Sequence, residues 1–379
     1  MESKLKFFQS HFFKSDIVHL NNAGLQPICL PAKNKINYWA ERFWQEGFLT
    51  DHDYMADVKN TRMQLSKLIK CLPEEIAFFT STAGAINQVA FGIDLKPDDE
   101  VLMWDQEYSS HLYPWKAACD ACGAKLILVE SESDLSTPVE NYKAAITDKT
   151  KVIAFSWVQF MNGARMSHLK ELIQYAKSKD IFVFIDIMQG LGFHDFNLWD
   201  SGVDAIMGGS HKWLLAPVGV GFLAIRNSLT LKLKPRVIGA YTYGTCDDPS
   251  DFACEPKRDA SKFEPGSKQV LEITALGAAI ELILNVGTKT IENEALRLAQ
   301  KLREGLSEKH YQVVSPFSQQ EIHSTAFVNF TPTHSVSIGE LSQKLNSHKI
   351  LHAIRGPGIR LTTQAFNTEE QIDFVLSVL

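Results

Sequence analysis

Two residues of this chain carry side chains that could act together in catalysis. Lys212 follows a short apolar run and precedes a segment of small residues, and Asp186 follows another apolar run, 181–185. A lysine amine can form a Schiff base with an aldehyde. A carboxylate can hold a proton on a pyridine nitrogen, which makes the ring an electron sink. Together they are what pyridoxal phosphate requires, whereas a solvated lysine and a helix-capping aspartate would explain each residue taken alone.

The elements that must position these residues follow from the hydrophobic pattern. Seven short and nearly continuous apolar runs are typical of strands buried on both faces, and helix-patterned segments separate them. This alternation predicts an α/β fold with a mainly parallel seven-stranded sheet covered by helices. The predicted strands are 76–79, 101–104, 125–129, 151–155, 181–185, 204–207 and 221–225, and the helices between them include 83–93, 110–122 and 168–179.

The pattern changes after the seventh strand. A long helix rich in Ala and Leu is predicted over 267–286, and an alternation of helices and strands follows it. We therefore expect a large cofactor-binding domain over 17–262. Residues 263–379, together with residues 1–16, are expected to form a smaller α+β domain.

The bulk properties exclude several classes of protein. A chain of 379 residues is long enough for two domains. Its net charge of −6 gives no basic face for nucleic acid and no polybasic membrane anchor. No apolar run approaches the ~20 residues of a membrane span, and the first residues do not have the pattern of a secretory signal.

The six cysteines are too few to form a disulfide scaffold in a chain of this length, so we expect a cytoplasmic protein with free thiols. Cys119 and Cys122 match C-x-x-C, but no second pair stands at the spacing of a metal site. We therefore expect two thiols in or near a helical core and no bound metal.

The surroundings of the lysine and the aspartate carry a family resemblance. Residues 186–189 have the pattern D-x-x-Q, and Ser210-His211-Lys212 has the pattern S-H-K, each after a predicted strand. From about residue 20 onward the chain resembles the class V aminotransferase family of fold-type I pyridoxal phosphate enzymes, which also includes cysteine desulfurases, isopenicillin N epimerase-like proteins and kynureninase. The resemblance implies pyridoxal 5'-phosphate as cofactor, Lys212 as its Schiff-base lysine and Asp186 as the partner of the ring nitrogen.

Residues after the predicted strands supply the implied phosphate site, because ligands of open α/β sheets bind at the carboxyl ends of the strands. Thr82, Ala83 and Gly84 follow the first of these strands and open a helix, whose N-terminus favours negative charge. Close packing of a helix start is the alternative for these small residues. In the family pattern Ser210 and His211 would contact the same phosphate.

The resemblance also implies contacts to the cofactor ring. Cysteine desulfurases carry a stacking histidine where this chain has Ser109, so Tyr108 or His111 would supply the ring face, unless His111 is a satisfied, half-buried polar residue. Gln159 replaces the desulfurase asparagine, as in the epimerase-like branch. Together with Gln189 it is expected near the phenolic oxygen of the cofactor.

Three further residues concern the substrate and a second subunit. Arg360 matches the arginine that holds the substrate α-carboxylate, for which a planar guanidinium is suited. Arg355 would recognise a second acidic group or support the loop. Ser267 lies in a segment that resembles F-E-x-G-T, whose hydroxyl reaches the phosphate of the neighbouring subunit, and this implies a homodimer with shared active sites. A simple helix-capping serine is the alternative.

The stretch 352–359 bears on the reaction because it contains no cysteine where desulfurases carry their catalytic thiol. Cys246 and Cys254 would have to approach from an unusual direction, so desulfuration is disfavoured. The implied function is an aminotransferase or a related lyase acting on an amino acid. An amino-acid epimerase is the second possibility. The third is a non-catalytic pyridoxal phosphate-binding protein, against which the presence of both Lys212 and Arg360 argues.

Overall fold

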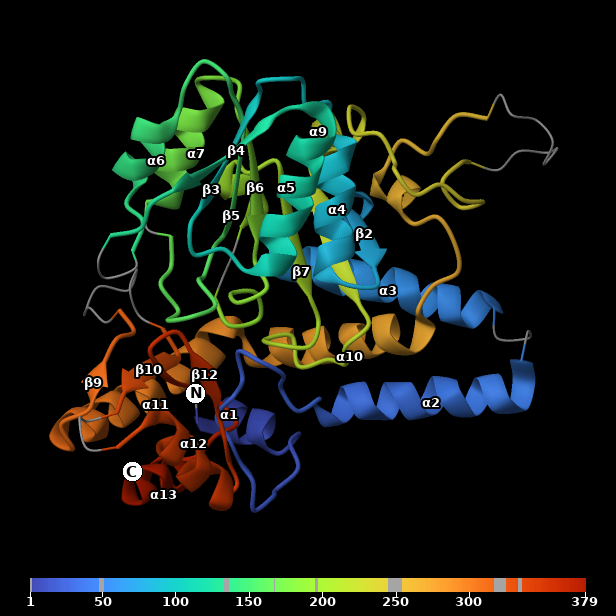
Figure 1. Cartoon of the computed structure of the whole chain (residues 1–379). Helices are drawn as coiled ribbons and strands as arrows, with labels where there is room; N and C mark the ends of the chain where they lie inside the picture. Colours follow the sequence, from blue (N-terminus) through green and yellow to red (C-terminus); the bar gives the residue numbers. More distant parts are fainter. Residues whose placement is uncertain are drawn as a thin grey trace.

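A seven-stranded sheet forms the upper part of the molecule in Figure 1. The computed structural model describes residues 2–47, 51–132, 136–166, 168–194, 197–244, 254–316, 325–332 and 336–379. The strand order is β2-β8-β7-β6-β5-β3-β4, and β8 runs in the direction opposite to the other six strands of this sheet. The strands are β2 (Ile76–Phe79), β3 (Glu100–Trp104), β4 (Lys125–Val129), β5 (Thr150–Ser156), β6 (Phe182–Asp186), β7 (Ala205–Gly209) and β8 (Gly221–Ile225).

The mainly parallel sheet is therefore confirmed, and every predicted strand end lies within two residues of the observed one. Alternation along each strand divides the side chains between two cores. In β5, Val152 and Ala154 belong to the core under α4 and α5, whereas Ile153 and Phe155 belong to the core on the other face. Because both faces are covered, the polar residues of the sheet are concentrated at the strand ends.

Helices cover both faces of the sheet. Long helices α2, α3 and α10 lie together beneath it in Figure 1, and α10 packs against both of the others. The helices of this part are α2 (Leu30–Glu46), α3 (Asp51–Ile69), α4 (Thr82–Gly92), α5 (Ser109–Cys122), α6 (Val139–Ala145), α7 (Leu169–Lys177), α8 (Leu198–Ser201), α9 (Asn227–Thr230) and α10 (Val270–Val286), with short 3-10 turns η2 (Pro73–Glu75) and η3 (Ala260–Phe263).

A second, antiparallel sheet lies in the lower part of Figure 1, with strand order β12-β13-β10-β9. A separate hydrophobic core joins it to the C-terminal helices. The helix α1 (Glu2–Gln9) contacts α10 and α11, and strand β1 (Val18–His19) pairs with β11 (Ile350–Leu351). The remaining elements are α11 (Thr288–Glu308), β9 (Gln312–Val313), β10 (Phe327–Thr331), α12 (Ile338–Ser347), β12 (Ala353–Arg355), β13 (Gly358–Thr362) and α13 (Glu369–Val378).

The predicted start of the long helix is wrong by three residues. Helix α10 begins at Val270, so Ser267 precedes it and does not cap it. Lys268 instead reaches back to Glu264 at 2.6 Å, and Arg62 holds the same carboxylate at 2.8 Å. These ion pairs hold the residues before the helix in an irregular segment.

The expectation of free thiols is confirmed for Cys119 and Cys122 in α5 but is wrong for Cys254, which is disulfide-bonded. Cys246 lies outside the described residues. Among the described residues, no group of three or more His, Cys, Asp or Glu side chains is arranged to hold a metal ion. No single described helix is long and apolar enough to cross a membrane, while α10 and α11 pass that test only as a pair bent by 81°.

Candidate active site

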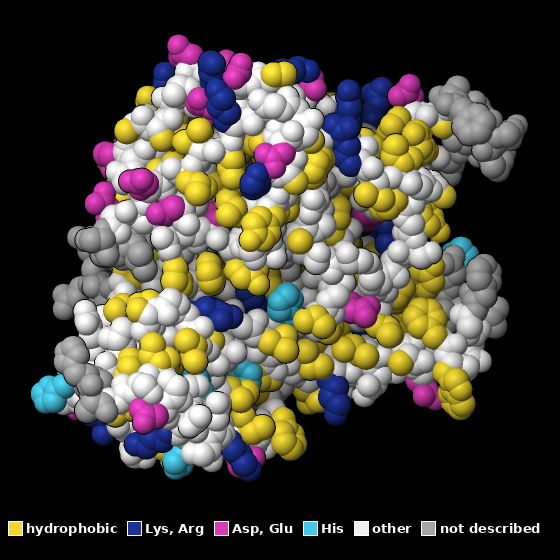
Figure 2. Space-filling model, in the orientation of Figure 1, with side chains coloured by type: hydrophobic (Ala, Val, Ile, Leu, Met, Phe, Trp, Pro, Cys, Tyr) yellow, Lys and Arg dark blue, Asp and Glu magenta, His cyan; other side chains and the backbone are white. Residues whose placement is uncertain are grey.

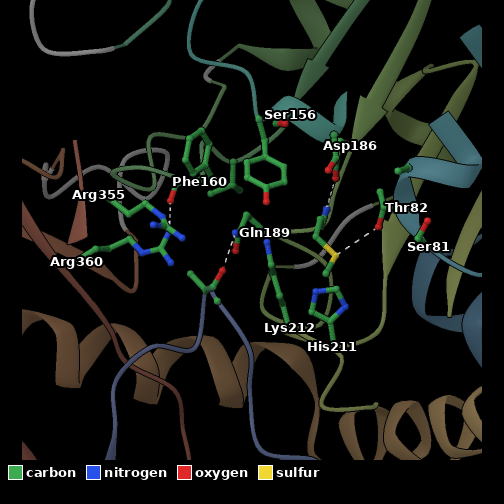
Figure 3. Close-up of a pocket in the computed structure, with 17 residues that line it drawn as sticks. Ser81, Thr82, Ser156, Phe160, Asp186, Gln189, His211, Lys212, Arg355 and Arg360 are labelled. Atoms are coloured by element: carbon green, nitrogen blue, oxygen red, sulfur yellow. Dashed lines mark hydrogen bonds between the residues drawn. The ribbon is translucent and has the colours of Figure 1, made fainter. Parts of the chain in front are cut away.

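Side chains from both sheets line one cavity of about 290 Å³. Figure 2 shows basic side chains in the hollow between the upper and lower parts of the molecule, and Figure 3 shows the lining at close range. Nine of the predicted site residues meet there: Thr82, Ala83, Tyr108, Asp186, Gln189, His211, Lys212, Arg355 and Arg360. The structure thus brings most of the predicted residues to one cavity, because the carboxyl ends of parallel strands share one edge of the sheet.

Lys212 lies in the loop that follows β7 and points into the cavity (Figure 3). Burial is the main cause that lowers the pKa of Lys212 to about 8. The attraction of Asp186 opposes this shift, and the positive charge of Arg360 adds to it. The lysine is thus far closer to its neutral, nucleophilic form near neutral pH than an exposed lysine would be.

Asp186 is the last residue of β6 and is buried at the wall of the cavity. Its Oδ1 accepts a hydrogen bond from the backbone N–H of Met188 at 2.7 Å, which fixes the orientation of the carboxylate. Burial raises the pKa of Asp186, whereas the nearby His111 acts in the opposite direction. A cationic ring nitrogen placed against this carboxylate would favour its charged form.

One end of the cavity is suited to a phosphate. Ser81 caps α4 and accepts a hydrogen bond from the N–H of Gly84 at 3.1 Å, and Ser81, Thr82 and Ala83 all line the cavity at this helix N-terminus. A Cβ atom on Gly221 would lie only 2.3 Å from the Ser81 carbonyl carbon, so a glycine is needed for β8 to approach this turn. This close approach holds the helix start at the edge of the cavity.

His211 stands between this phosphate end and the lysine. It is partly buried, and burial followed by the neighbouring Lys212 lowers its pKa to about 4. The imidazole is therefore neutral at neutral pH and presents one N–H donor. Its backbone carbonyl accepts a hydrogen bond from the N–H of Gln26, which ties the loop to the N-terminal segment.

The opposite end of the cavity carries two guanidinium groups (Figure 3). Arg360 in β13 is only 1% exposed, donates to the carbonyl oxygen of Phe160, and reaches Oδ1 of Asn21 at 3.4 Å. Its Nε has no hydrogen-bond partner among the described residues. Burial, together with the charge of Arg355, lowers the pKa of Arg360. A bound carboxylate would satisfy this buried cation.

Four predicted residues do not line this cavity. Gln159 and Ser210 are buried behind its wall, and the Ser210 hydroxyl donates to the carbonyl oxygen of Pro217. Gly84 and Ser267 instead line a separate and more apolar cavity of about 570 Å³. The assignment of all four residues as cofactor contacts stays a prediction.

The two candidates for the ring face have different positions. Tyr108 lines the cavity, whereas His111 is completely buried and pairs through Nδ1 with Glu107 at 3.0 Å. Glu107 also accepts a hydrogen bond from the hydroxyl of Ser156 at 2.7 Å, and Ser156 does line the cavity. His111 therefore lies behind the cavity wall, where it contacts Glu107, and does not itself line the cavity.

Sequence reasoning missed part of the lining, including Ala23, Gly24, Ser110 and Phe160. The carbonyl oxygen of Ala23 accepts a hydrogen bond from Nε2 of Gln189 at 3.0 Å, so the N-terminal segment closes one side of the cavity. An Asn-Asn-Ala-Gly run at 21–24 is a turn signal, but nothing local indicates that this turn meets Gln189 in the loop after β6.

The described residues fit pyridoxal phosphate. The cavity combines a helix N-terminus for the phosphate, a buried carboxylate for the ring nitrogen and an amine with a lowered pKa for the aldehyde. The donor set thus has a place for each polar group of the cofactor.

Comparisons with known proteins agree with this fit. The chain is 25% identical over 311 residues to an uncharacterized aminotransferase of Bacillus subtilis, a match that covers 82% of this chain and 80% of the relative. It is 26% identical over 332 residues to isopenicillin N epimerase of Amycolatopsis lactamdurans, covering 84% and 83% of the two chains. Among solved structures, the cysteine desulfurase of Thermococcus onnurineus has the same fold, with a TM-score of 0.84 at 20% identity and coverage of 96% and 94%.

The family model described as aminotransferase class-V matches residues 45–360. The match spans both sheets and includes the lysine, the aspartate and both arginines of the cavity. The chain belongs to the class V aminotransferase family, and its cofactor is pyridoxal 5'-phosphate.

Proposed function

We propose that this protein is an aminotransferase, or a closely related lyase, that acts on an amino acid with pyridoxal phosphate held at Lys212. One observation carries the proposal: a single cavity brings together the amine of Lys212, the carboxylate of Asp186 and the buried guanidinium of Arg360. A protein that only bound the cofactor would have no need of a buried arginine at the end opposite the phosphate.

The cofactor, when bound, supplies an aldehyde for an amine and a ring that withdraws electrons from the amino-acid Cα. Asp186 would hold a proton at the ring nitrogen. Arg360 would orient the α-carboxylate and so fix which Cα bond faces the ring. Lys212, with its pKa lowered to about 8, is suited to remove the Cα proton and to return it.

Epimerisation is the second candidate function. It requires the same Cα deprotonation, followed by return of the proton to the other face of Cα. The similarity to isopenicillin N epimerase, and Gln159 in place of the desulfurase asparagine, support this candidate.

Desulfuration is disfavoured in spite of the desulfurase relatives. The turn between β12 and β13 has the sequence Arg-Gly-Pro-Gly, and no cysteine among the described residues lines the cavity. Purified holoenzyme given L-cysteine should therefore release no more sulfide than a Lys212→Ala variant. Substantial release that depends on Cys246 or Cys254 would contradict this.

A two-fold homodimer with shared active sites belongs to the proposal. Large apolar side chains lie exposed on the described surface, among them Trp44 at 80% and Val237 at 64%. Val237 also lines the apolar cavity that contains Ser267, so a second copy of the chain that packed there would cover Val237. The cytoplasmic location expected from the sequence stays a prediction.

The experiment that tests the proposed reaction is incubation of the holoenzyme with single amino acids. An aminotransferase should convert the cofactor to its amine form and release a keto acid, both followed by absorbance and product assay. A lyase should release a product without that conversion, and an epimerase should change only the optical rotation of the amino acid. If no amino acid yields the amine form of the cofactor, a keto acid or another released product, the proposed function is wrong.

A further inference from the structure

The charges on the wall of the active-site cavity do not balance at its substrate end. Lys212, Arg355 and Arg360 are cationic, whereas Asp186 is the one carboxylate among the described lining residues. Figure 3 shows Ser81 and Thr82 on one side of Lys212 and both arginines on the other. A phosphate at the Ser81 end would thus leave two guanidinium groups to face the substrate.

One of these guanidinium groups is sufficient for an α-carboxylate. Arg360 is buried and already held from two sides by Phe160 and Asn21, so its direction is fixed. A planar guanidinium binds one carboxylate through two parallel hydrogen bonds. The second guanidinium, of Arg355, remains without an anionic partner.

The backbone of Arg355 is rigidly placed. It pairs with Gly358 across the β12–β13 turn, and the buried Asn329 donates through Nδ2 to the carbonyl oxygen of Arg355 at 3.0 Å. The same Nδ2 reaches the carbonyl oxygen of Met161 at 3.1 Å. Asn329 therefore fixes the turn against the loop that follows β5, where Phe160 forms part of the cavity wall.

The side chain of Arg355 contributes little to this arrangement. Its Nη1 donates to the carbonyl oxygen of the preceding residue, Ile354, at 2.9 Å, and no carboxylate of the described residues pairs with it. The turn is supported by backbone atoms and by Asn329, so loop support does not account for the guanidinium. An arginine that is exposed yet lines the cavity is placed to meet a ligand.

We propose that Arg355 binds a second acidic group, so that the amino acid taken by this site carries an anionic side chain in addition to its α-carboxylate. This inference rests on the proposed function and names its substrate class. The alternative is that both arginines share a single carboxylate. If both arginines share one carboxylate, the binding of an amino acid with a neutral side chain should also depend on Arg355. If Arg355 binds a second acidic group, it should not.

The test compares apparent dissociation constants of the holoenzyme, taken from the absorbance change on titration with matched amino acids. L-Aspartate and L-glutamate carry a side-chain carboxylate, L-asparagine and L-glutamine are their neutral counterparts, and O-phospho-L-serine against L-serine tests a phosphate. Wild-type protein should bind at least one acidic member about tenfold or more tightly than its neutral counterpart. Arg355→Gln should abolish that preference and leave the neutral amino acids within about twofold.

Two control variants sharpen the comparison. Arg355→Lys should restore part of the preference, and Lys170→Gln, which removes an exposed charge on α7, should leave it unchanged. Equal binding of acidic and neutral amino acids by wild type, or equal weakening of both by Arg355→Gln, would overturn the inference. Calorimetry with succinate and butyrate tests the role of Arg355 independently of the proposed reaction. Neither ligand has an amine, so neither can react with the cofactor, and their affinities report only on the binding of carboxylates. Succinate that binds no more tightly than butyrate would also overturn the inference, whatever the amino acids do.

Discussion

The side-chain nitrogen of Lys212 lies 5.7 Å from the centre of the Tyr108 ring. The same ring meets Phe160 edge-on, with 5.2 Å between the ring centroids. An aromatic face therefore stands beside the amine, and Phe160 limits how far this ring can turn. His111, the other candidate for the ring face, is buried against Glu107 instead.

We expect Tyr108 to stack on the cofactor ring. Tyr108→Phe should bind pyridoxal phosphate within about twofold of wild type, because the ring remains, whereas Tyr108→Ala should weaken binding about two- to tenfold. Equilibrium dialysis of the cofactor measures both. An alanine variant with wild-type affinity would show that the ring has no such role.

The fold was largely predictable from the sequence because strands buried on both faces are continuous apolar runs, as in β6 and β8. The same pattern predicted that Asp186 and Lys212 lie near strand ends, and the structure places Asp186 at the end of β6 and Lys212 in the loop after β7. Ala23 was missed because its contact with Gln189 joins residues 166 positions apart. Ser267 was misplaced relative to α10 because ion pairs at Glu264, distant in sequence from Arg62, determine where that helix begins.

The lowered pKa of Lys212 predicts the pH dependence of cofactor loading. Only the neutral amine attacks the aldehyde, and its fraction rises with pH to one half near pH 8. At pH 7 about a tenth of the lysine is neutral, roughly 300 times the fraction at the ordinary pKa of 10.5. The rate at which cofactor-free protein regains visible absorbance should therefore increase through pH 7 and level off above pH 8.

Asp186→Asn provides the control for this pH profile. The carboxylate raises the pKa of Lys212, so its removal should move the inflection to lower pH. A wild-type profile that still rises steeply above pH 10 would show that the lysine is not perturbed.

The same Asp186→Asn variant should retain the fold but lose most turnover. An asparagine Oδ1 can still accept the hydrogen bond from Met188, whereas a neutral amide cannot hold the proton on the ring nitrogen. We expect kcat to fall by about a hundredfold or more, measured with whichever amino acid the wild type converts. Turnover within a few-fold of wild type would mean that Asp186 has only a structural role.

Subunit complementation tests the shared site. Lys212→Ala and a bulky Ser267→Trp variant, each inactive alone, are mixed and allowed to exchange subunits. If Ser267 serves the neighbouring site, one site of the heterodimer carries both lesions and the other carries neither, so about a quarter of wild-type activity should return. If mass spectrometry confirms exchange and activity does not return, Ser267 does not contribute to the partner's site.

The central claim is that Lys212 carries the cofactor, and reduction of the holoenzyme with borohydride tests it most directly. The reduced protein is digested, and mass spectrometry locates the pyridoxyl group. We predict that Lys212 is the single modified lysine of the wild-type protein. The Lys212→Ala variant, treated in the same way, should not carry a pyridoxyl group in a comparable amount on any lysine. A pyridoxyl group on any other lysine of the wild-type protein would contradict the account.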